Sequence, residues 1–188
     1  MKTRESGMPP EEMWQTFFDP LVALVRLGLT SECACVVDFG CGYGTFSVPA
    51  ATMVRGVVHA LDIDAEMVSA TKAKGEEMHL DNLKAAVRDF VAVGSGLEDG
   101  SADYVMLFNI LHAAESDVLL KEARRVLRRG GKLGVMHWNH DPSTPRGPSM
   151  AIRPKPEQCM RMVEEAGFEM SPLIDFPPFH YGFVGIAR

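Results

Sequence analysis

The stretch of this chain best suited to ligand chemistry sets three glycines in alternate positions after an acidic residue. Asp38 closes a short apolar run, and Gly40, Gly42 and Gly44 follow it before a run that favours a helix. Glycine permits positive φ in a tight turn and leaves no Cβ between the backbone and a ligand. The N–H groups that open the next helix favour negative charge in the same space. The pattern predicts a strand, a turn and a helix that hold a nucleotide-like ligand, with a purely structural turn as the alternative.

The spacing of the glycines separates two classes of ligand. A dinucleotide fingerprint, G-x-G-x-x-G, has its third glycine where the helix packs on the strand, but this chain has Thr45 at that position. Asp38, two residues before the first glycine, would crowd a pyrophosphate and suits a cationic or amino-bearing ligand. The spacing therefore argues against a nicotinamide-dependent oxidoreductase, which would share the same strand–helix–strand unit.

A second acidic residue follows the next apolar run, residues 56–61. Asp62 lies 18 residues beyond Gly44. In α/β nucleotide folds, the acid that ends the second strand accepts hydrogen bonds from ribose hydroxyls. A solvated capping role is the alternative for Asp62, although Asp64 is the better candidate for the N-cap of the helix that follows.

The elements that must position these residues alternate between strands and helices. After the strand that ends at Asp38, strands are expected at 56–62, 83–90, 102–108, 131–137, 169–176 and 179–187. Helices are expected at 21–29, 45–51, from 64 onward, at 117–129 and at 156–166, the fourth of these from its amphipathic spacing. Open α/β sheets bind ligands at the carboxyl edge of their strands, which is where the acids and glycines above fall.

The pattern D-x-G-x-G-x-G from Asp38 to Gly44 resembles motif I of the class I S-adenosylmethionine-dependent methyltransferases. Residues 60–67 resemble the segment that follows motif I, and residues 127–133 resemble the family's glycine-glycine turn, with Arg129 in place of a proline. The resemblance extends from about residue 20 to residue 188. It implies a single α/β domain over residues 1–188, with a Rossmann-like seven-stranded mixed sheet, an antiparallel last strand and helices on both faces.

The resemblance also implies S-adenosylmethionine as the cofactor and S-adenosylhomocysteine as its product. In the family the strand-end acid holds the ribose, the next apolar side chain packs on adenine, and a later acid accepts from the adenine amino group. The cofactor-binding residues carried over in this way are Asp38, Gly40, Cys41, Gly42, Gly44, Asp62, Ile63, Asp89, Phe90 and Asn109.

The sequence gives weaker evidence for the residues that bind the methyl acceptor. Residues 109–112 read Asn-Ile-Leu-His where methyltransferases of amide or adenine nitrogens often carry N/D-P-P-Y/F. This departure resembles the small-molecule branch of the family and implies a small or medium soluble acceptor. A hydroxyl or protonated amine must lose a proton to a base, for which His112, His137 and His140 are candidates that the sequence does not separate. A helix cap is the alternative for His112, and the spacing of His137 and His140 on a strand end is poor for a metal pair, so no metal is expected.

A long segment without a helix or strand period, residues 138–155, is predicted to form a wall for the acceptor. Five prolines between 142 and 156 would stiffen it, and loops beyond ~12–15 residues are usually functional or disordered. Trp138, Arg146 and Arg153 are its candidate acceptor-binding residues. The two arginines would favour an acceptor that carries a carboxylate or phosphate.

The N-terminal residues 1–19 are predicted to cover the site. A polar lead precedes an apolar cluster at helical spacing that includes Trp14, Phe17 and Phe18. Methyl transfer benefits from a closed pocket with little water, and no other apolar cluster lacks a role. Trp14 and Phe18 are therefore candidate substrate-binding residues, with permanent core as the alternative.

The composition of the 188 residues limits the classes of partner. Hydrophobic residues at 46% and charged residues at 23% are ordinary for a globular protein, and the formal charge of −6 gives no electrostatic footprint for nucleic acid. No apolar run approaches the ~18 residues of a membrane span, and no signal peptide is evident. The four cysteines form no disulfide ladder or zinc motif. We expect a cytoplasmic enzyme with a small-molecule acceptor and no nucleic-acid or membrane partner. A non-catalytic sensor or scaffold that binds the cofactor is the alternative, and the oligomeric state stays open.

Overall fold

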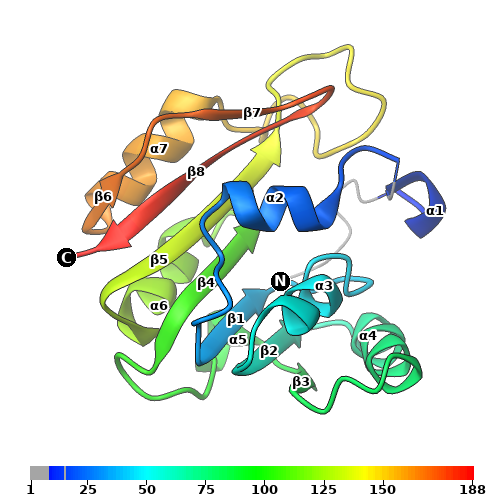
Figure 1. Ribbon diagram of the computed structural model, residues 1–188. Coiled ribbons are helices and arrows are strands. Elements are labelled where there is room, and N and C mark those ends of the chain that lie inside the picture. The colour runs from blue at the N-terminus through cyan, green and yellow to red at the C-terminus, as the bar shows by residue number, and fades with distance from the viewer. Residues whose placement is uncertain (1–8, 15) are drawn as a thin grey trace.

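One mixed sheet of eight strands runs through the described part of the chain, residues 9–14 and 16–188 of a computed structural model (Figure 1). Its strand order is β3-β2-β1-β4-β5-β8-β6, and β7 pairs with β8. The strands are β1 Cys35–Phe39, β2 Val57–Asp62, β3 Leu83–Val87, β4 Ala102–Phe108, β5 Leu127–Trp138, β6 Phe168–Met170, β7 Ile174–Phe176 and β8 His180–Ala187. The helices are α1 Glu11–Trp14, α2 Pro20–Arg26, α3 Ser47–Met53, α4 Ala65–Glu77, α5 Phe90–Val93, α6 Ser116–Val126 and α7 Pro156–Glu165.

Strands β1 to β5 are parallel, and β8 lies antiparallel to β5. The expected Rossmann-like mixed sheet with an antiparallel last strand is thus confirmed. The single strand expected at 169–176 is divided into β6 and β7, which gives eight strands in place of seven. The break falls at Pro172, which has no N–H to donate to a ladder.

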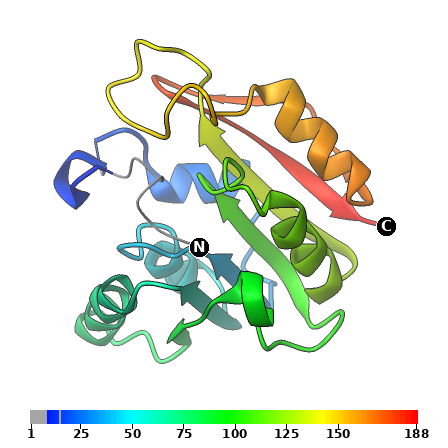
Figure 2. The ribbon, with the colours of Figure 1, turned by 180° about the vertical axis from the view of Figure 1, so that it is seen from behind.

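Helices cover both faces of the sheet, as the sequence predicts. Helices α2 and α3 lie on one face, and α5, α6 and α7 lie on the other (Figures 1 and 2). Neighbouring residues of one strand serve opposite faces: Val36 packs in the cluster under α2 and α3, whereas Val37 packs in the cluster under α6 and α7. This two-sided burial explains why the parallel strands read as continuous apolar runs.

The junction between α6 and β5 differs from the sequence expectation. Helix α6 ends at Val126, and Leu127 already pairs with Ala102 of β4, whereas the helix was expected to continue to Arg129. The register then shifts, so that Lys132 lies opposite Tyr104. A β-bulge of this kind accommodates extra residues in one strand, and it accounts for the early start of β5.

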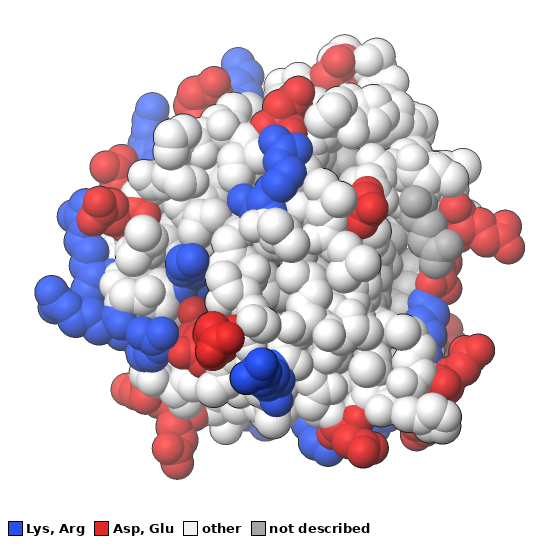
Figure 3. All heavy atoms as spheres, viewed as in Figure 1, with Lys and Arg blue, Asp and Glu red and all other residues white. Residues whose placement is uncertain are grey.

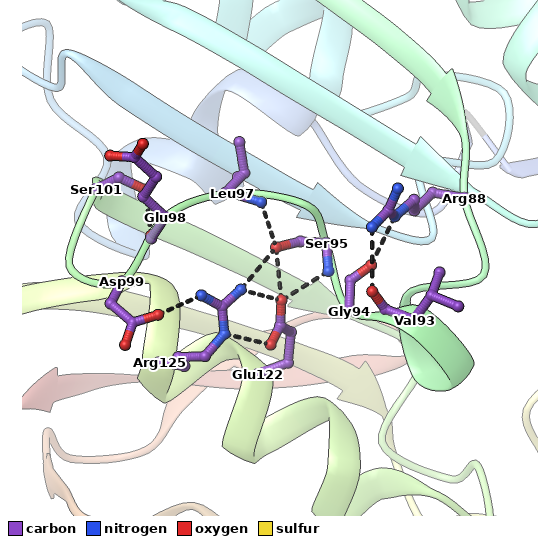
Figure 4. A network of polar contacts seen from close by, with 10 residues as sticks. All are labelled: Arg88, Val93, Gly94, Ser95, Leu97, Glu98, Asp99, Ser101, Glu122 and Arg125. Carbon is purple, nitrogen blue, oxygen red and sulfur yellow. Dashed lines mark hydrogen bonds and ion pairs between the residues drawn. The ribbon is translucent and has the colours of Figure 1, made fainter.

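A polar network fixes the loop before β4 to α6 (Figure 4). The Glu122 carboxylate accepts from the backbone N–H and the hydroxyl of Ser95 at 2.7 and 2.6 Å, and Arg125 donates to it through two nitrogens. Hydrogen bonds from Arg125, followed by those from Ser95, lower the pKa of Glu122 to about 2. The carboxylate therefore stays ionised, and it ties the loop to α6.

The surface shown in Figure 3 carries acidic and basic side chains intermixed around a largely uncharged centre. Among the described residues, no helix has both the length and the apolar character needed to cross a bilayer.

Candidate active site

The glycine turn after β1 is tied to the end of β2. The backbone N–H groups of Gly40 and Cys41 both donate to Leu61 O, at 2.8 and 3.0 Å. Gly40 and Gly44 have φ of 82° and 78°, which disfavours any residue with a Cβ. At Gly44 a Cβ would also lie 2.9 Å from Thr71 Oγ1, so this glycine lets the turn pack against α4.

Asp62 is held at the end of β2 by two backbone donors. Its Oδ2 accepts from Gly42 N at 2.9 Å, and its Oδ1 accepts from Asp64 N at 3.0 Å. Asp64 in turn caps α4 by accepting from Glu66 N at 2.8 Å, which confirms the predicted N-cap. Each Asp62 oxygen retains acceptor capacity for a ligand hydroxyl, and the side chain is only 6% exposed.

A cavity of about 580 Å³ opens beside this turn, at the carboxyl ends of β1, β2 and β4. Ten residues expected to bind cofactor or acceptor, or to catalyse, line it: Trp14, Asp38, Gly40, Cys41, Gly42, Asp62, Ile63, Phe90, Asn109 and His112. The others lie outside its lining: Phe18, Gly44, Asp89, His137, Trp138, His140, Arg146 and Arg153. The sequence analysis missed several lining residues, of which Tyr43, Phe46, Met67, Phe108 and Ile110 are the largest.

The missed residues follow directly from the motifs that were recognised. Tyr43 and Phe46 belong to the glycine turn or come immediately after it, and Met67 lies in the first turn of α4, three residues after its cap. Asp89, by contrast, lies beside the cavity, where its Oδ1 accepts from Ala92 N at 2.9 Å and caps α5. Its neighbour Phe90 does line the cavity.

Asp38 brings a buried carboxyl group to the cavity wall. It is 3% exposed, and Ser47 Oγ donates to its Oδ2 at 2.5 Å. Burial raises the pKa of Asp38 to about 7. The hydrogen bond from Ser47 lowers this pKa, and the negative charge of Asp62 raises it further. A nearby cation would restore the ionised form, because an opposite charge favours it.

Asn109 provides an amide group without a protein partner. It directly follows β4 with φ of 55°, and its backbone N–H donates to Met136 O at 2.7 Å. Its side-chain Oδ1 and Nδ2 are both buried, and neither has a hydrogen-bond partner within the described structure. Leaving such a group unsatisfied costs ~1–3 kcal/mol, so the amide is suited to a ligand that supplies the missing partners.

Two of the three candidate histidines are brought together by the sheet. His112 Nδ1 lies 3.3 Å from His137 Nε2, and His137 Nδ1 lies 3.4 Å from Trp138 O. Burial, followed by the positive charge of Arg153, lowers the pKa of His112 to about 4. Burial, followed by His112, lowers the pKa of His137 to about 3. His140 lies apart, on the loop after β5, with its Nδ1 2.7 Å from Arg153 O.

Arg153 organises the loop after β5 from within. Its side chain is 6% exposed, and its guanidinium donates to the carbonyls of Asn139, Asp141, Arg146 and Pro148 and to the Thr144 hydroxyl. These hydrogen bonds hold the loop together. The sequence analysis had instead predicted that Arg153 binds an anionic acceptor. Arg146 is exposed, and no residue of 138–155 lines the cavity.

The N-terminal segment reaches the cavity through Trp14. This side chain lines the cavity and is 6% exposed, and its ring lies 5.5 Å from that of Trp138. Phe18 stacks on Phe46 at 5.1 Å between centroids. Lys74 of α4 pairs with Glu11 and donates to Tyr43 O at 2.6 Å, so it links α1 to the glycine turn. Residues 1–8 and 15 of the predicted cover lie outside the described residues.

The cavity lining fits S-adenosylmethionine, the cofactor implied by the resemblance. Asp62 offers a carboxylate for ribose hydroxyls, and Ile63, Met67 and Phe90 offer apolar contact for adenine. On the other side of the glycine turn, Asp38 suits an ammonium group. Asn109, whose amide has no partner in the described structure, also lines the cavity.

The comparisons with known proteins agree with this geometry. A methyltransferase domain family matches residues 36–131. The chain is 30% identical over 156 residues to the ribosomal protein L11 methyltransferase of Methylococcus capsulatus, which covers 82% of this chain but only 44% of that protein. The chain thus spans less than half the length of this curated relative.

Two solved structures illustrate the likeness of fold. A SAM-dependent methyltransferase from Aquifex aeolicus superposes with a TM-score of 0.83 and 22% identity over 93% of this chain and 92% of that one. The geranyl diphosphate C-methyltransferase from Streptomyces coelicolor, solved with Mg²⁺, geranyl diphosphate and S-adenosylhomocysteine, gives 0.75 and 14% over 90% and 77%. With a family match over half of its length and a site built to fit the cofactor, this chain belongs to the class I S-adenosylmethionine-dependent methyltransferases.

Proposed function

We propose that this protein transfers a methyl group from S-adenosylmethionine to a small or medium-sized soluble acceptor bound in the same cavity. The observation that carries the proposal is that one cavity of about 580 Å³ joins the glycine turn and Asp62 to a second region formed by Phe46, Phe108, His112 and Trp14. Because β1 lies between β2 and β4 in the sheet, the nucleotide end and the acceptor end flank the glycine turn.

The cofactor supplies an electrophilic methyl group on a sulfonium, so the protein needs mainly to position the acceptor in line with the methyl–sulfur bond. In our proposal Asp62 binds the ribose hydroxyls, Ile63 and Phe90 contact adenine, and Asp38 and Asn109 bind the amino-acid end. Trp14 excludes water above the reacting atoms, which strengthens electrostatic interactions in the cavity.

The charges around the cavity indicate which acceptors it favours. Of the lining residues that the structure describes, none is a lysine or arginine, whereas Asp38, Asp62, Asp64 and Glu115 are acidic. With Arg153 committed to its own loop, the site offers little to an anionic acceptor. We infer a neutral or cationic acceptor with an apolar body that packs against Phe46 and Phe108, in place of the carboxylate or phosphate that the arginines suggested.

A protein side chain is the second candidate acceptor. It is favoured by the 30% identity to a protein named for its action on ribosomal protein L11. A side chain that enters the cavity must displace or pass the Trp14 segment, whereas a small molecule can be enclosed beneath it. This difference makes the small acceptor the better supported of the two.

The test combines binding with turnover. Calorimetry should show binding of S-adenosylmethionine and S-adenosylhomocysteine but not of NAD, and micromolar affinity corresponds to about −8 kcal/mol. A library of neutral and cationic small molecules, and separately of protein substrates, is then screened for formation of S-adenosylhomocysteine. NAD binding without a response to S-adenosylhomocysteine would overturn the assignment. Cofactor binding without turnover of any acceptor would favour the sensor or scaffold alternative.

A further inference from the structure

A pair of neutral histidines connects the acceptor end of the cavity to the interior of the sheet. His112 follows β4 and lines the cavity, whereas His137 lies in β5 and is 0% exposed. Their rings meet edge to face, with centroids 5.5 Å apart. The only side-chain polar contact of His112 in the described residues is with His137.

The hydrogen bonds of His137 determine which nitrogen carries its proton. A backbone carbonyl can only accept, so the contact between His137 Nδ1 and Trp138 O places the proton on Nδ1. In a neutral imidazole the other nitrogen is then an acceptor. His137 Nε2 therefore accepts from His112, and His112 must carry its proton on Nδ1. This chain of bonds leaves His112 Nε2 with a lone pair on a ring that lines the cavity.

We propose that His112 Nε2 accepts the proton that the methyl acceptor loses, and that His137 is the positioning residue that holds His112 in the required tautomer. The proposal rests on the proposed methyltransferase function and specifies its acceptor as one with a hydroxyl or N–H at the reacting atom. His140, which bonds to the loop carbonyl of Arg153, has no part in it.

The step balances as follows. A lone pair on the acceptor atom forms the bond to the methyl carbon, and the carbon–sulfur bond breaks with its electron pair going to sulfur. The acceptor proton moves to His112 Nε2 and later to water. One positive charge thus passes from sulfur to the imidazole, and the net charge of the closed cavity does not change.

A weakly basic imidazole is adequate for this step. As the new bond forms, positive charge builds on the acceptor atom and makes its proton strongly acidic, so a base whose conjugate acid has a pKa of about 4 can take it. Because that pKa lies well below neutrality, the base remains unprotonated across the physiological range. Activity should therefore not be lost as the pH falls through 6.5, the pKa of an ordinary histidine.

Other charged and titratable groups surround the histidine pair and can affect the pH dependence of activity. Arg153 from the loop after β5 lowers the pKa of both histidines, and His180 from β8 lowers that of His137. Tyr181 of β8 lies 6.2 Å from His137, ring to ring. Asp38 and Glu115 line the same cavity as His112. Of these groups, Asp38 titrates near neutrality, so the profile is recorded at saturating cofactor.

The direct experiment is two-bond ¹H–¹⁵N correlation NMR of the histidine side chains at pH 7, without cofactor. We expect neutral rings with the proton on Nδ1 for both His112 and His137. Protonation of His112 on Nε2 in the folded protein would overturn the proposal, whatever the turnover. This readout does not depend on identifying the acceptor, so it separates failure of the proposal from failure of the proposed function.

Variants then separate a positioning role from a structural one. His112→Gln should lower kcat by about 10²-fold or more and leave S-adenosylhomocysteine affinity within about twofold. His137→Phe should shift His112 away from the Nδ1–H tautomer and lower kcat at least tenfold. The side-chain oxygen of His137→Gln can accept from His112. This variant should therefore restore most of the Nδ1–H tautomer of His112 and most of kcat. The control is His79→Asn, an exposed histidine with φ of 56° that asparagine tolerates. Full activity of His112→Gln would refute the proton transfer.

Discussion

At the scale of single residues, the site depends on acids that the backbone holds in place. Asp62 accepts from two backbone N–H groups, and Asp38 accepts from one serine hydroxyl. Both residues are almost fully buried yet line the cavity, so their remaining acceptor positions are available to a ligand bound there. Substitution at either residue should therefore act first on cofactor affinity.

Asp62→Ala should weaken S-adenosylhomocysteine binding by about ten- to a hundredfold, since hydrogen bonds to a charged group contribute roughly 1.5–3 kcal/mol. Isothermal titration calorimetry measures the loss, and circular dichroism checks that the fold is retained. The matched control is Asp117→Asn, which removes a surface carboxylate that is paired with Lys121 and does not line the cavity. Equal affinity of Asp62→Ala and the parent protein would return Asp62 to a purely structural role.

Asp38 should make cofactor binding pH-dependent. Its pKa is raised to about 7, and the ammonium group of the cofactor binds the ionised form, so affinity should rise with pH up to about 8. Below 7 the ligand must displace a proton, and affinity falls by up to about tenfold per pH unit. Asp38→Asn should bind more weakly and with a flat profile between pH 6 and 8. A flat profile in the parent protein would contradict the assignment.

At the scale of elements, the N-terminal segment is both a wall of the cavity and a part of the core. Trp14 lines the cavity, and with Phe17 it joins the cluster of buried residues that includes Trp138. Away from the aromatic rings, Lys74 links the segment to α4 and the glycine turn through Glu11 and Tyr43 O. We propose that this link holds the segment closed over the acceptor.

Lys74→Gln should loosen the segment with little effect on global stability. The side chains of the pair are 32% and 29% exposed, and surface ion pairs contribute about 0–1 kcal/mol. We expect faster protease cleavage before Asp19, measured by mass spectrometry, with a shift in Tm of less than about 4 °C. Lys121→Gln is the matched control, because it removes a surface ion pair within α6. Equal cleavage rates in the two variants would argue against the link.

At the scale of the whole molecule, two buried histidines, His137 and His180, and the half-buried His112 are held in the neutral form. Burial is the main cause that lowers the pKa of His112 to about 4 and those of His137 and His180 to about 3. His180 is completely buried between Trp14, Phe18 and Trp138, and neither of its ring nitrogens has a partner in the described structure. The unfolded chain binds these protons at pH 6.5, so acid favours unfolding.

The free energy of unfolding should therefore fall as pH decreases from 6.5 to about 4.5. Asp38 acts in the opposite direction, because its folded pKa of about 7 lies above its unfolded value and the native state keeps that proton. Counting these four groups alone, three histidine protons against one aspartate proton give about 2.7 kcal/mol per pH unit, and the lowered pKa of His59 adds in the same direction. Urea titrations at pH 6.5, 5.5 and 4.5 measure the slope. His180→Phe should reduce this slope by about 1.4 kcal/mol per pH unit. The control variant His79→Asn, at an exposed position, should leave the slope unchanged.

The parts of the fold and site that depend on local sequence could be predicted. The glycine turn, Asp62 at its strand end and the cap at Asp64 are each set by a few consecutive residues, and the structure places them as expected. The start of β5 could not be predicted, because it results from pairing between Leu127 and Ala102 across the sheet. Strand pairing of this kind leaves no local signal.

The acceptor side of the site could be predicted even less from local sequence. His112 and His137 are 25 residues apart and meet only because β4 and β5 are neighbours. The role of Arg153 depends on five surrounding loop groups that no spacing rule connects. The pairing of Trp14 with Trp138 likewise depends on where the first helix lies in the folded chain, because the two residues are far apart in the sequence.

The loop wound around Arg153 has a consequence for engineering. Its backbone carbonyls turn inward to one planar guanidinium, so its shape is set from the inside, and an exposed residue such as Arg146 contributes its carbonyl oxygen to this arrangement. A lysine cannot replace Arg153, because three ammonium protons cannot reproduce the planar fork. Such a loop is a rigid frame on which new recognition residues can be grafted without redesigning the catalytic cavity.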